Sequence, residues 1–60
     1  MTPKEALERA VEVVSNHMLW TVSNLSAART ALVENKDNFT NSQLFYAERL
    51  IMELNSLGAK

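Results

Sequence analysis

The sequence predicts an all-α protein: an antiparallel helical hairpin, with one long and one shorter helix, that dimerises into a four-helix bundle. Three features lead to this prediction. Apolar residues recur at helical spacing through both halves of the chain. One turn-rich cluster, residues 35–40, separates a helix over about residues 3–34 from a helix over about residues 41–57, in a single domain of residues 1–60. A chain of 60 residues without cysteine has a small core and no disulfides, and such chains commonly gain stability by association.

The first helix has a start signal at residues 2–5. Thr2 is placed to cap the helix, and Pro3 suits the first helical position, where a missing N–H costs nothing. Glu5 stands three residues after Thr2, so that each side chain can accept a hydrogen bond from the backbone of the other residue. This capping box predicts a helix that begins at Pro3.

Residues 13–28 contain no charged residue. The run is too short and too polar to span a membrane, which takes about 20 mostly apolar residues. A helix with one side in water carries charges on that side, so we expect neighbours on more than one side of this run. Because neither Gly nor Pro interrupts it, one continuous helix is the favoured prediction. Its serines, asparagines and β-branched residues leave a break near Ser15-Asn16 or Ser23-Asn24 as the alternative.

Two stripes run along this predicted long helix. The first consists of Leu7, Val11, Val14, Met18, Thr21 with Val22, Leu25, Ala28 and Leu32. The shorter helix of the same chain is expected to cover only the C-terminal half of the long helix, which leaves Leu7, Val11 and Val14 to be covered from elsewhere. The second lies about 100° around the helix. It is the predicted dimer interface, an antiparallel contact between two long helices, and consists of Ala6, Ala10, Val13, His17, Trp20, Ala27 and Ala31. Small residues at both ends allow close approach, and His17 and Trp20 are expected to stack with their own copies near the two-fold axis.

The second helix is expected to begin directly after the turn. Thr40 is the predicted N-cap, Gln43 is its capping-box partner, and Phe39 is placed to pack on the helix as a hydrophobic staple. The helix is expected to run to about residue 57. Gly58 then follows in the left-handed conformation that ends many helices.

Phe45 and Met52 stand seven residues apart, nearly opposite the main apolar face of the second helix. Two roles remain open for them. They cover Leu7, Val11 and Val14 of a second copy, or they form an exposed strip that docks another protein.

No catalytic, cofactor-binding or metal-binding residue is predicted. His17 is the single histidine, and we interpret it as an interface residue rather than a general base. Glu5, Glu8 and Glu12 suit the positive end of a helix dipole. The Glu-x-x-His pattern of helical di-iron sites is absent because residue 14 is valine, and a single glycine cannot form a phosphate loop. We therefore expect a protein that is not an enzyme.

Residues 34–46, Glu-Asn-Lys-Asp-Asn-Phe-Thr-Asn-Ser-Gln-Leu followed by Phe-Tyr, resemble the helix–loop–helix of the Hha/YmoA family of nucleoid modulators. The resemblance covers this part of the chain alone and requires a gap before Phe45-Tyr46. Members of that family bind partner proteins rather than reading DNA themselves, and a nucleoid-modulator-like role belongs to the nucleic-acid-associated alternative given below. Loop and capping preferences produce the same pattern, so no functional residue is carried over.

The expected function is that of a small non-enzymatic protein–protein interaction or regulatory module, such as an inhibitor, that acts as a homodimer on a larger protein. Neither a signal-peptide start nor a lipidation motif is present, so a cytoplasmic location is expected. The alternative is a nucleic-acid-associated regulator, in which dimerisation gathers Arg9, Arg29 or Arg49 into one basic stripe. Nucleic acid is the less expected partner, because the formal net charge is −1 and the basic residues are scattered.

Overall fold

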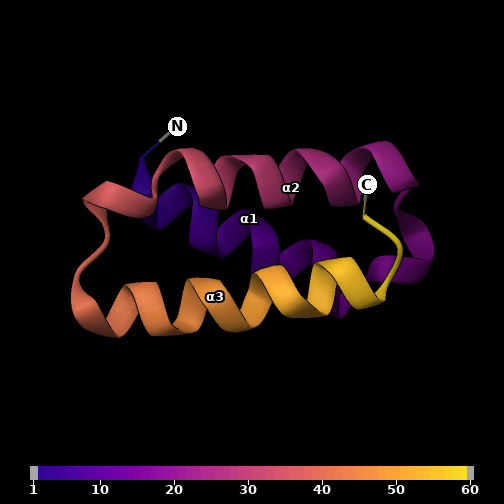
Figure 1. The fold of residues 1–60 in the computed structure, drawn as a ribbon. Coiled ribbons are helices and arrows are strands. Elements are labelled where there is room, and N and C mark those ends of the chain that lie inside the picture. Colours follow the sequence, from indigo (N-terminus) through magenta and orange to yellow (C-terminus); the bar gives the residue numbers. More distant parts are fainter. Residues whose placement is uncertain (1, 60) are drawn as a thin grey trace.

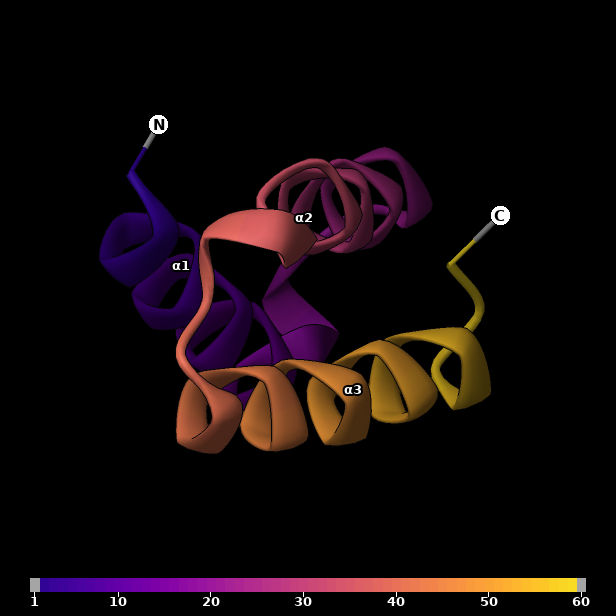
Figure 2. The same ribbon diagram turned by 60° about the vertical axis from the view of Figure 1, so that its left-hand side comes forward.

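A computed structural model describes residues 2–59, and this part of the chain is a three-helix bundle without strands. The helices are α1 (Pro3–Ser15), α2 (Val22–Glu34) and α3 (Asn41–Ser56), joined by two short 3-10 turns, η1 (His17–Leu19) and η2 (Lys36–Asn38). Consecutive helices run in opposite directions, so η1 and η2 lie at opposite ends of the bundle (Figure 1). In an oblique view, α1 and α2 lie side by side and α3 crosses below both of them (Figure 2). The all-α prediction is confirmed. Within residues 2–59, every helix falls short of the length and apolar character needed to cross a bilayer.

The prediction of one continuous helix over residues 3–34 is wrong, and with it the two-helix hairpin. The chain leaves the helix after Ser15, where both the backbone N–H and the side-chain amide of Asn16 donate to the Glu12 carbonyl, at 3.1 and 3.2 Å. It re-enters a helix at Val22, after Trp20 and Thr21 in extended conformation. The break therefore falls at the first of the two alternative sites. Asn24 at the second site lies in the first turn of α2.

A capping box that the sequence reasoning missed explains this second start. The Thr21 hydroxyl accepts from the Asn24 backbone N–H at 3.3 Å, and the Asn24 side-chain oxygen accepts from the Thr21 N–H at 3.2 Å. The predicted boxes at Thr2 and Thr40 are both confirmed. The three capping threonines, Thr2, Thr21 and Thr40, are evenly spaced along the chain. The starts of successive helices are therefore separated by the same number of residues.

The end of α3 agrees with the prediction. Gly58 has φ of 110°, in the left-handed region. Its N–H donates to the Asn55 carbonyl at 3.2 Å, and the Ala59 N–H donates to the Leu54 carbonyl at 3.0 Å. This pair of bonds is a Schellman motif, which satisfies carbonyls that the helix itself leaves unpaired.

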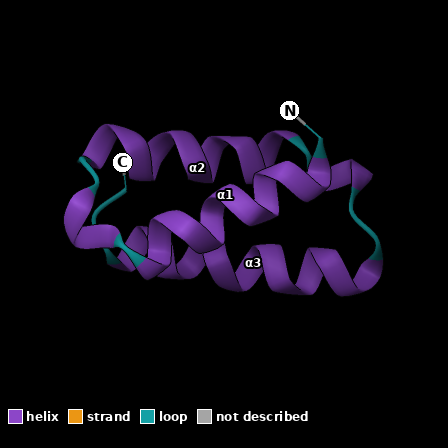
Figure 3. Cartoon of the chain, turned by 180° about the vertical axis from the view of Figure 1, so that it is seen from behind, coloured by secondary structure: helices purple, strands orange, loops and turns teal. Residues whose placement is uncertain are grey.

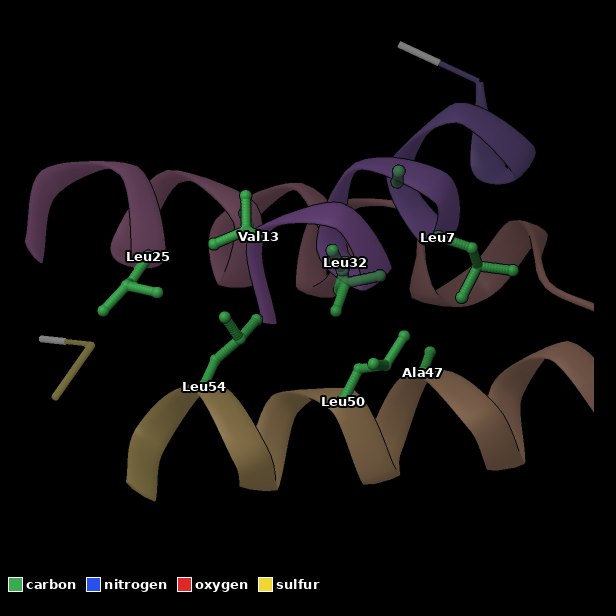
Figure 4. Close-up of a cluster of buried hydrophobic side chains, with 10 residues drawn as sticks. Leu7, Val13, Leu25, Leu32, Ala47, Leu50 and Leu54 are labelled. Carbon is green, nitrogen blue, oxygen red and sulfur yellow. The ribbon is translucent and has the colours of Figure 1, made fainter. Parts of the chain in front are cut away.

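All three helices contribute to one apolar core (Figure 4). Leu50 and Leu54 of α3 point towards Leu25 and Leu32 of α2 and towards α1. Alanines on every helix allow the backbones to approach closely. The buried residues are Ala6, Leu7, Ala10, Val13, Leu25, Ala28, Leu32, Ala47, Leu50 and Leu54. Among residues 2–59 no polar or charged residue is buried, so apolar packing stabilises this fold without buried ion pairs.

Within one chain, the helices already cover part of the apolar surface of α1 that a second copy was expected to cover. Leu7 is buried by the chain's own helices, and Val11 and Val14 are half-buried. Folding α2 back along α1 achieves this, because α2 and α3 both lie against α1 when the structure is seen from behind (Figure 3). A dimer of such chains contains six helices rather than the predicted four.

Candidate binding surfaces

The seven residues of the predicted dimer interface do not share one face. Ala6, Ala10 and Val13 lie in the monomer core, with exposed fractions of 0%, 0% and 1%. His17 is exposed in η1, Trp20 is half-buried, and on α2 Ala27 is exposed while Ala31 is half-buried. The predicted contact between two long helices needs one straight helix from residue 6 to residue 31. The chain reverses direction between these residues, so this fold does not offer that contact.

Trp20 closes one end of the core instead of projecting from a helix. Its ring packs against the buried cluster, and the Arg9 guanidinium carbon lies 5.4 Å from the ring centroid, within cation–π distance. The indole Nε1 is buried without a hydrogen-bond partner in the described structure. These contacts assign Trp20 to the packing of α1 against the turn.

The turn η1 presents two large apolar side chains to solvent. Met18 is 87% exposed and Leu19 is 83% exposed; we call this pair the apolar turn. Two backbone hydrogen bonds close the turn, from Leu19 N–H to the Asn16 carbonyl at 2.8 Å and from Trp20 N–H to the His17 carbonyl at 3.2 Å. These bonds do not involve the side chains at positions 18 and 19.

The outer face of α3 carries the second apolar surface. Phe45 is 76% exposed and Met52 is 72% exposed, and together with Glu48 and Arg49 they line a shallow hollow of about 270 Å³. We call these four residues the α3 strip. Ala47, Leu50 and Leu54 of the same helix are buried, so the strip faces away from the core.

One hollow, between the end of α3 and the residues where α1 passes into η1, brings together three residues of types that serve in catalysis. His17, Glu53 and Ser56 line one open hollow of about 260 Å³. The hydrogen bonds of the described residues do not connect any two of these three side chains; Nδ1 of His17 lies 3.4 Å from the Val14 carbonyl oxygen. A nucleophile needs a base within hydrogen-bond reach, and this arrangement does not provide one.

The acidic start of α1 has a structural role. The Thr2 hydroxyl donates to Glu5 Oε1 at 2.9 Å, and this bond, together with the bond from the Thr2 backbone N–H, lowers the pKa of the Glu5 carboxyl. Across residues 2–59 the structure brings no three His, Cys, Asp or Glu residues together in a way that could hold a metal ion.

The arginines of the nucleic-acid alternative are held apart by separate contacts. Arg9 lies over the Trp20 ring. Arg29 donates to the Asn55 side chain and, at 3.4 Å, to the Ala59 carbonyl. Arg49 pairs with a carboxylate one turn further along α3 at 3.9 Å. Within residues 2–59, the three arginines therefore contact three different parts of the fold.

Comparison of the chain with models of known families, with curated proteins and with solved structures found no match.

Proposed function

We propose that this chain is a small non-enzymatic protein–protein interaction module of regulatory or inhibitor type, which acts as a homodimer and docks a larger protein through the apolar turn. The observation that carries the proposal is the exposure of Met18 and Leu19 in a turn whose geometry does not need them. A cytoplasmic location belongs to the same proposal.

Burial of these two side chains offers a substantial driving force for binding. A large aliphatic side chain gains about 2 kcal/mol when it moves from water to an apolar environment. The core of the monomer is complete without Met18 and Leu19, so this free energy is not used in folding. Two adjacent apolar side chains that are exposed on a turn suit insertion into a partner's pocket, where binding hot spots are commonly found.

The surroundings of the turn define the chemistry of the partner. Residues 13–28 carry no charge, and several polar but uncharged residues of this run are exposed beside the turn: Ser15, Asn16, Thr21 and Ser23. A partner with charges around its pocket would bury them against these residues without a counter-charge, which is costly. Two charged groups from outside the run lie against it: Arg9 over the Trp20 ring, and Glu53 in the same hollow as His17. We therefore propose a docking site on the partner that is an apolar pocket, with a rim that is polar and uncharged where it meets Ser15, Asn16, Thr21 and Ser23.

The uncharged run supports the same proposal from the sequence. A run without charges was expected to have neighbours on more than one side, yet in the monomer Ser15 through Leu19 are all exposed. A partner protein supplies the missing neighbour. His17, Glu53 and Ser56 are exposed, and no hydrogen bond of the described residues joins any two of their side chains. Both observations support a role without catalysis.

The test is capture of the partner from an extract of the native host, followed by its identification and a direct affinity measurement. A Met18→Ser/Leu19→Ser chain should bind the identified partner about 100-fold more weakly, because two hot-spot side chains are lost. The matched control is Asp37→Ser/Asn38→Ser in η2, which removes the exposed side chains at the equivalent positions of the other turn and should leave the affinity unchanged. Equal affinity of the wild type and the Met18→Ser/Leu19→Ser chain would refute docking through this turn.

A further inference from the structure

We infer that the α3 strip is the self-association site of this chain, where two copies pack α3 against α3 in parallel about a two-fold axis that runs along the helices. The inference rests on the proposed homodimer and names its contact. It gives Phe45 and Met52 the second copy as their partner, but through the same residues of that copy rather than through Leu7, Val11 and Val14.

The arrangement of the four residues on the helix carries the inference. Phe45 and Met52 are seven residues apart and so lie nearly in line along α3. Glu48 and Arg49 are adjacent in sequence, about 100° apart around the helix, so one lies on each flank of the apolar line. All four line the same hollow. The strip thus has an apolar centre, an acidic flank and a basic flank.

These opposite flanks select the orientation of the second copy. A two-fold axis parallel to the helices places the acidic flank of each copy against the basic flank of the other, so Glu48 meets Arg49 twice, at nearly the same height. An antiparallel arrangement brings acidic flank to acidic flank and basic flank to basic flank. Like charges across an interface oppose association and opposite charges favour it. Charge complementarity therefore favours the parallel pair.

The apolar and polar positions are compatible with the same register. Phe45 and Met52 each meet their own copies at the axis, as apolar residues do in parallel coiled coils. At the two ends of the strip, Asn41 and Ser56 are exposed polar residues and bring no charge to the axis. The pair between Arg49 and Glu53 within one chain is 3.9 Å long and exposed, so it competes weakly for Arg49.

The size of the contact sets the strength of the dimer. One helix pair buries less than the roughly 800 Å² per partner of a standard stable interface, and association must also offset the loss of translational and rotational freedom. We expect a dissociation constant of about 10–500 μM, and hence a monomer–dimer equilibrium that depends on protein concentration.

A parallel dimer also places the two apolar turns at one end. The turn lies at the end of the bundle where α3 finishes (Figure 1), and the two-fold axis keeps both copies of α3 in the same direction. A larger partner with two pockets then meets two turns at once, which raises the apparent affinity without a new contact.

Charge exchange across the strip tests the contact by sedimentation equilibrium. Glu48→Arg or Arg49→Glu alone makes both flank contacts repulsive and should raise the dissociation constant about tenfold. The Glu48→Arg/Arg49→Glu chain restores both contacts and should return to the wild-type value. An equimolar mixture of the two single variants should form a heterodimer of wild-type affinity. Thermal melts check that the variants remain folded, which is expected because both residues are exposed.

Cysteine cross-linking tests the orientation, since the chain has no cysteine of its own. In the parallel pair, Asn41→Cys alone and Ser56→Cys alone should each oxidise to a covalent dimer. In an antiparallel pair, each position lies about 22 Å from its own copy, so only a mixture of the two variants would cross-link. Cross-linking of the mixture alone would overturn the parallel arrangement.

The outcomes separate this inference from the proposed function. If the dissociation constant of the dimer is the same for the wild type and for every charge variant, the α3 contact is wrong, but the proposal of a homodimer is not affected. A monomer at about 1 mM overturns the contact and the homodimer together. In either case, partner binding through the apolar turn is tested separately, by the affinity of the Met18→Ser/Leu19→Ser chain.

Discussion

The chain turns twice, from α1 to α2 through η1 and from α2 to α3 through η2, and the two turns have the same construction. In each, an asparagine ends the preceding helix: the side chains of Asn16 and Asn35 donate to the carbonyl four residues back, at 3.2 and 2.8 Å. Each turn then makes the same two backbone hydrogen bonds. An aromatic residue, Trp20 or Phe39, follows in extended conformation and packs against the core.

The exposed side chains of the two turns differ completely. η2 presents Lys36, Asp37 and Asn38, which are typical of a solvated turn, whereas η1 presents Met18 and Leu19 after His17. Because η2 forms the same backbone with charged residues, the backbone does not require apolar residues at these positions. The apolar character of η1 therefore has another cause, and protein binding is the cause that we propose.

The aromatic residues should show the largest effect. Trp20→Ala removes the larger ring from the bundle end and should lower the free energy of unfolding by about 3 kcal/mol, and Phe39→Ala by about 2 kcal/mol. Trp20→Phe is the control: it keeps an aromatic ring and loses the five-membered ring of the indole, whose N–H has no partner, so it should cost less than Trp20→Ala. Urea unfolding followed by circular dichroism measures all three. Equal losses for Trp20→Phe and Trp20→Ala would contradict the expectation that a benzene ring keeps part of the packing at this position.

The two N-caps that follow the turns should have intermediate and similar effects. Thr21→Ala and Thr40→Ala each remove the hydroxyl that accepts from the third residue of the next helix, and each should cost about 1 kcal/mol. Thr→Ser at either position keeps the acceptor and should cost less. Thermal melts compare the four variants. An unchanged melt for Thr21→Ala would mean that the break between α1 and α2 does not depend on this cap.

Exchange of the exposed residues should have the smallest effect on stability. Met18→Asp/Leu19→Asn gives η1 the residues that η2 carries at the same positions, and we expect a change within about 0.5 kcal/mol, because these side chains are exposed. The same variant should lose the proposed partner. If the free energy of unfolding instead falls by several kcal/mol in urea, Met18 and Leu19 stabilise the fold, and the apolar residues of η1 have a structural cause.

Much of the fold could be read from short sequence signals. The capping boxes at Thr2 and Thr40 and the end at Gly58 depend on residues three or four positions apart, so their chemistry is complete in the local sequence. The exposed Phe45 and Met52 also followed from helical spacing, since they stand opposite the apolar face of α3. The same kind of signal was present at Thr21 and Asn24, but asparagine is a less familiar capping-box partner than glutamate or glutamine, and it was read as a weak point within a helix.

Local sequence alone therefore determined where helices can start and stop, which faces are apolar, and that residues 13–28 are uncharged. The tertiary structure decided that the chain breaks at Asn16, because folding α2 back buries Leu25, Ala28 and Leu32 against α1 and α3 of the same chain. One long helix would have left much of its apolar surface to a second chain. The choice between these arrangements depends on the free energy of burying side chains that are distant in sequence, and that same choice brings Ala6, Ala10 and Val13 into the core and leaves Met18 and Leu19 in solvent.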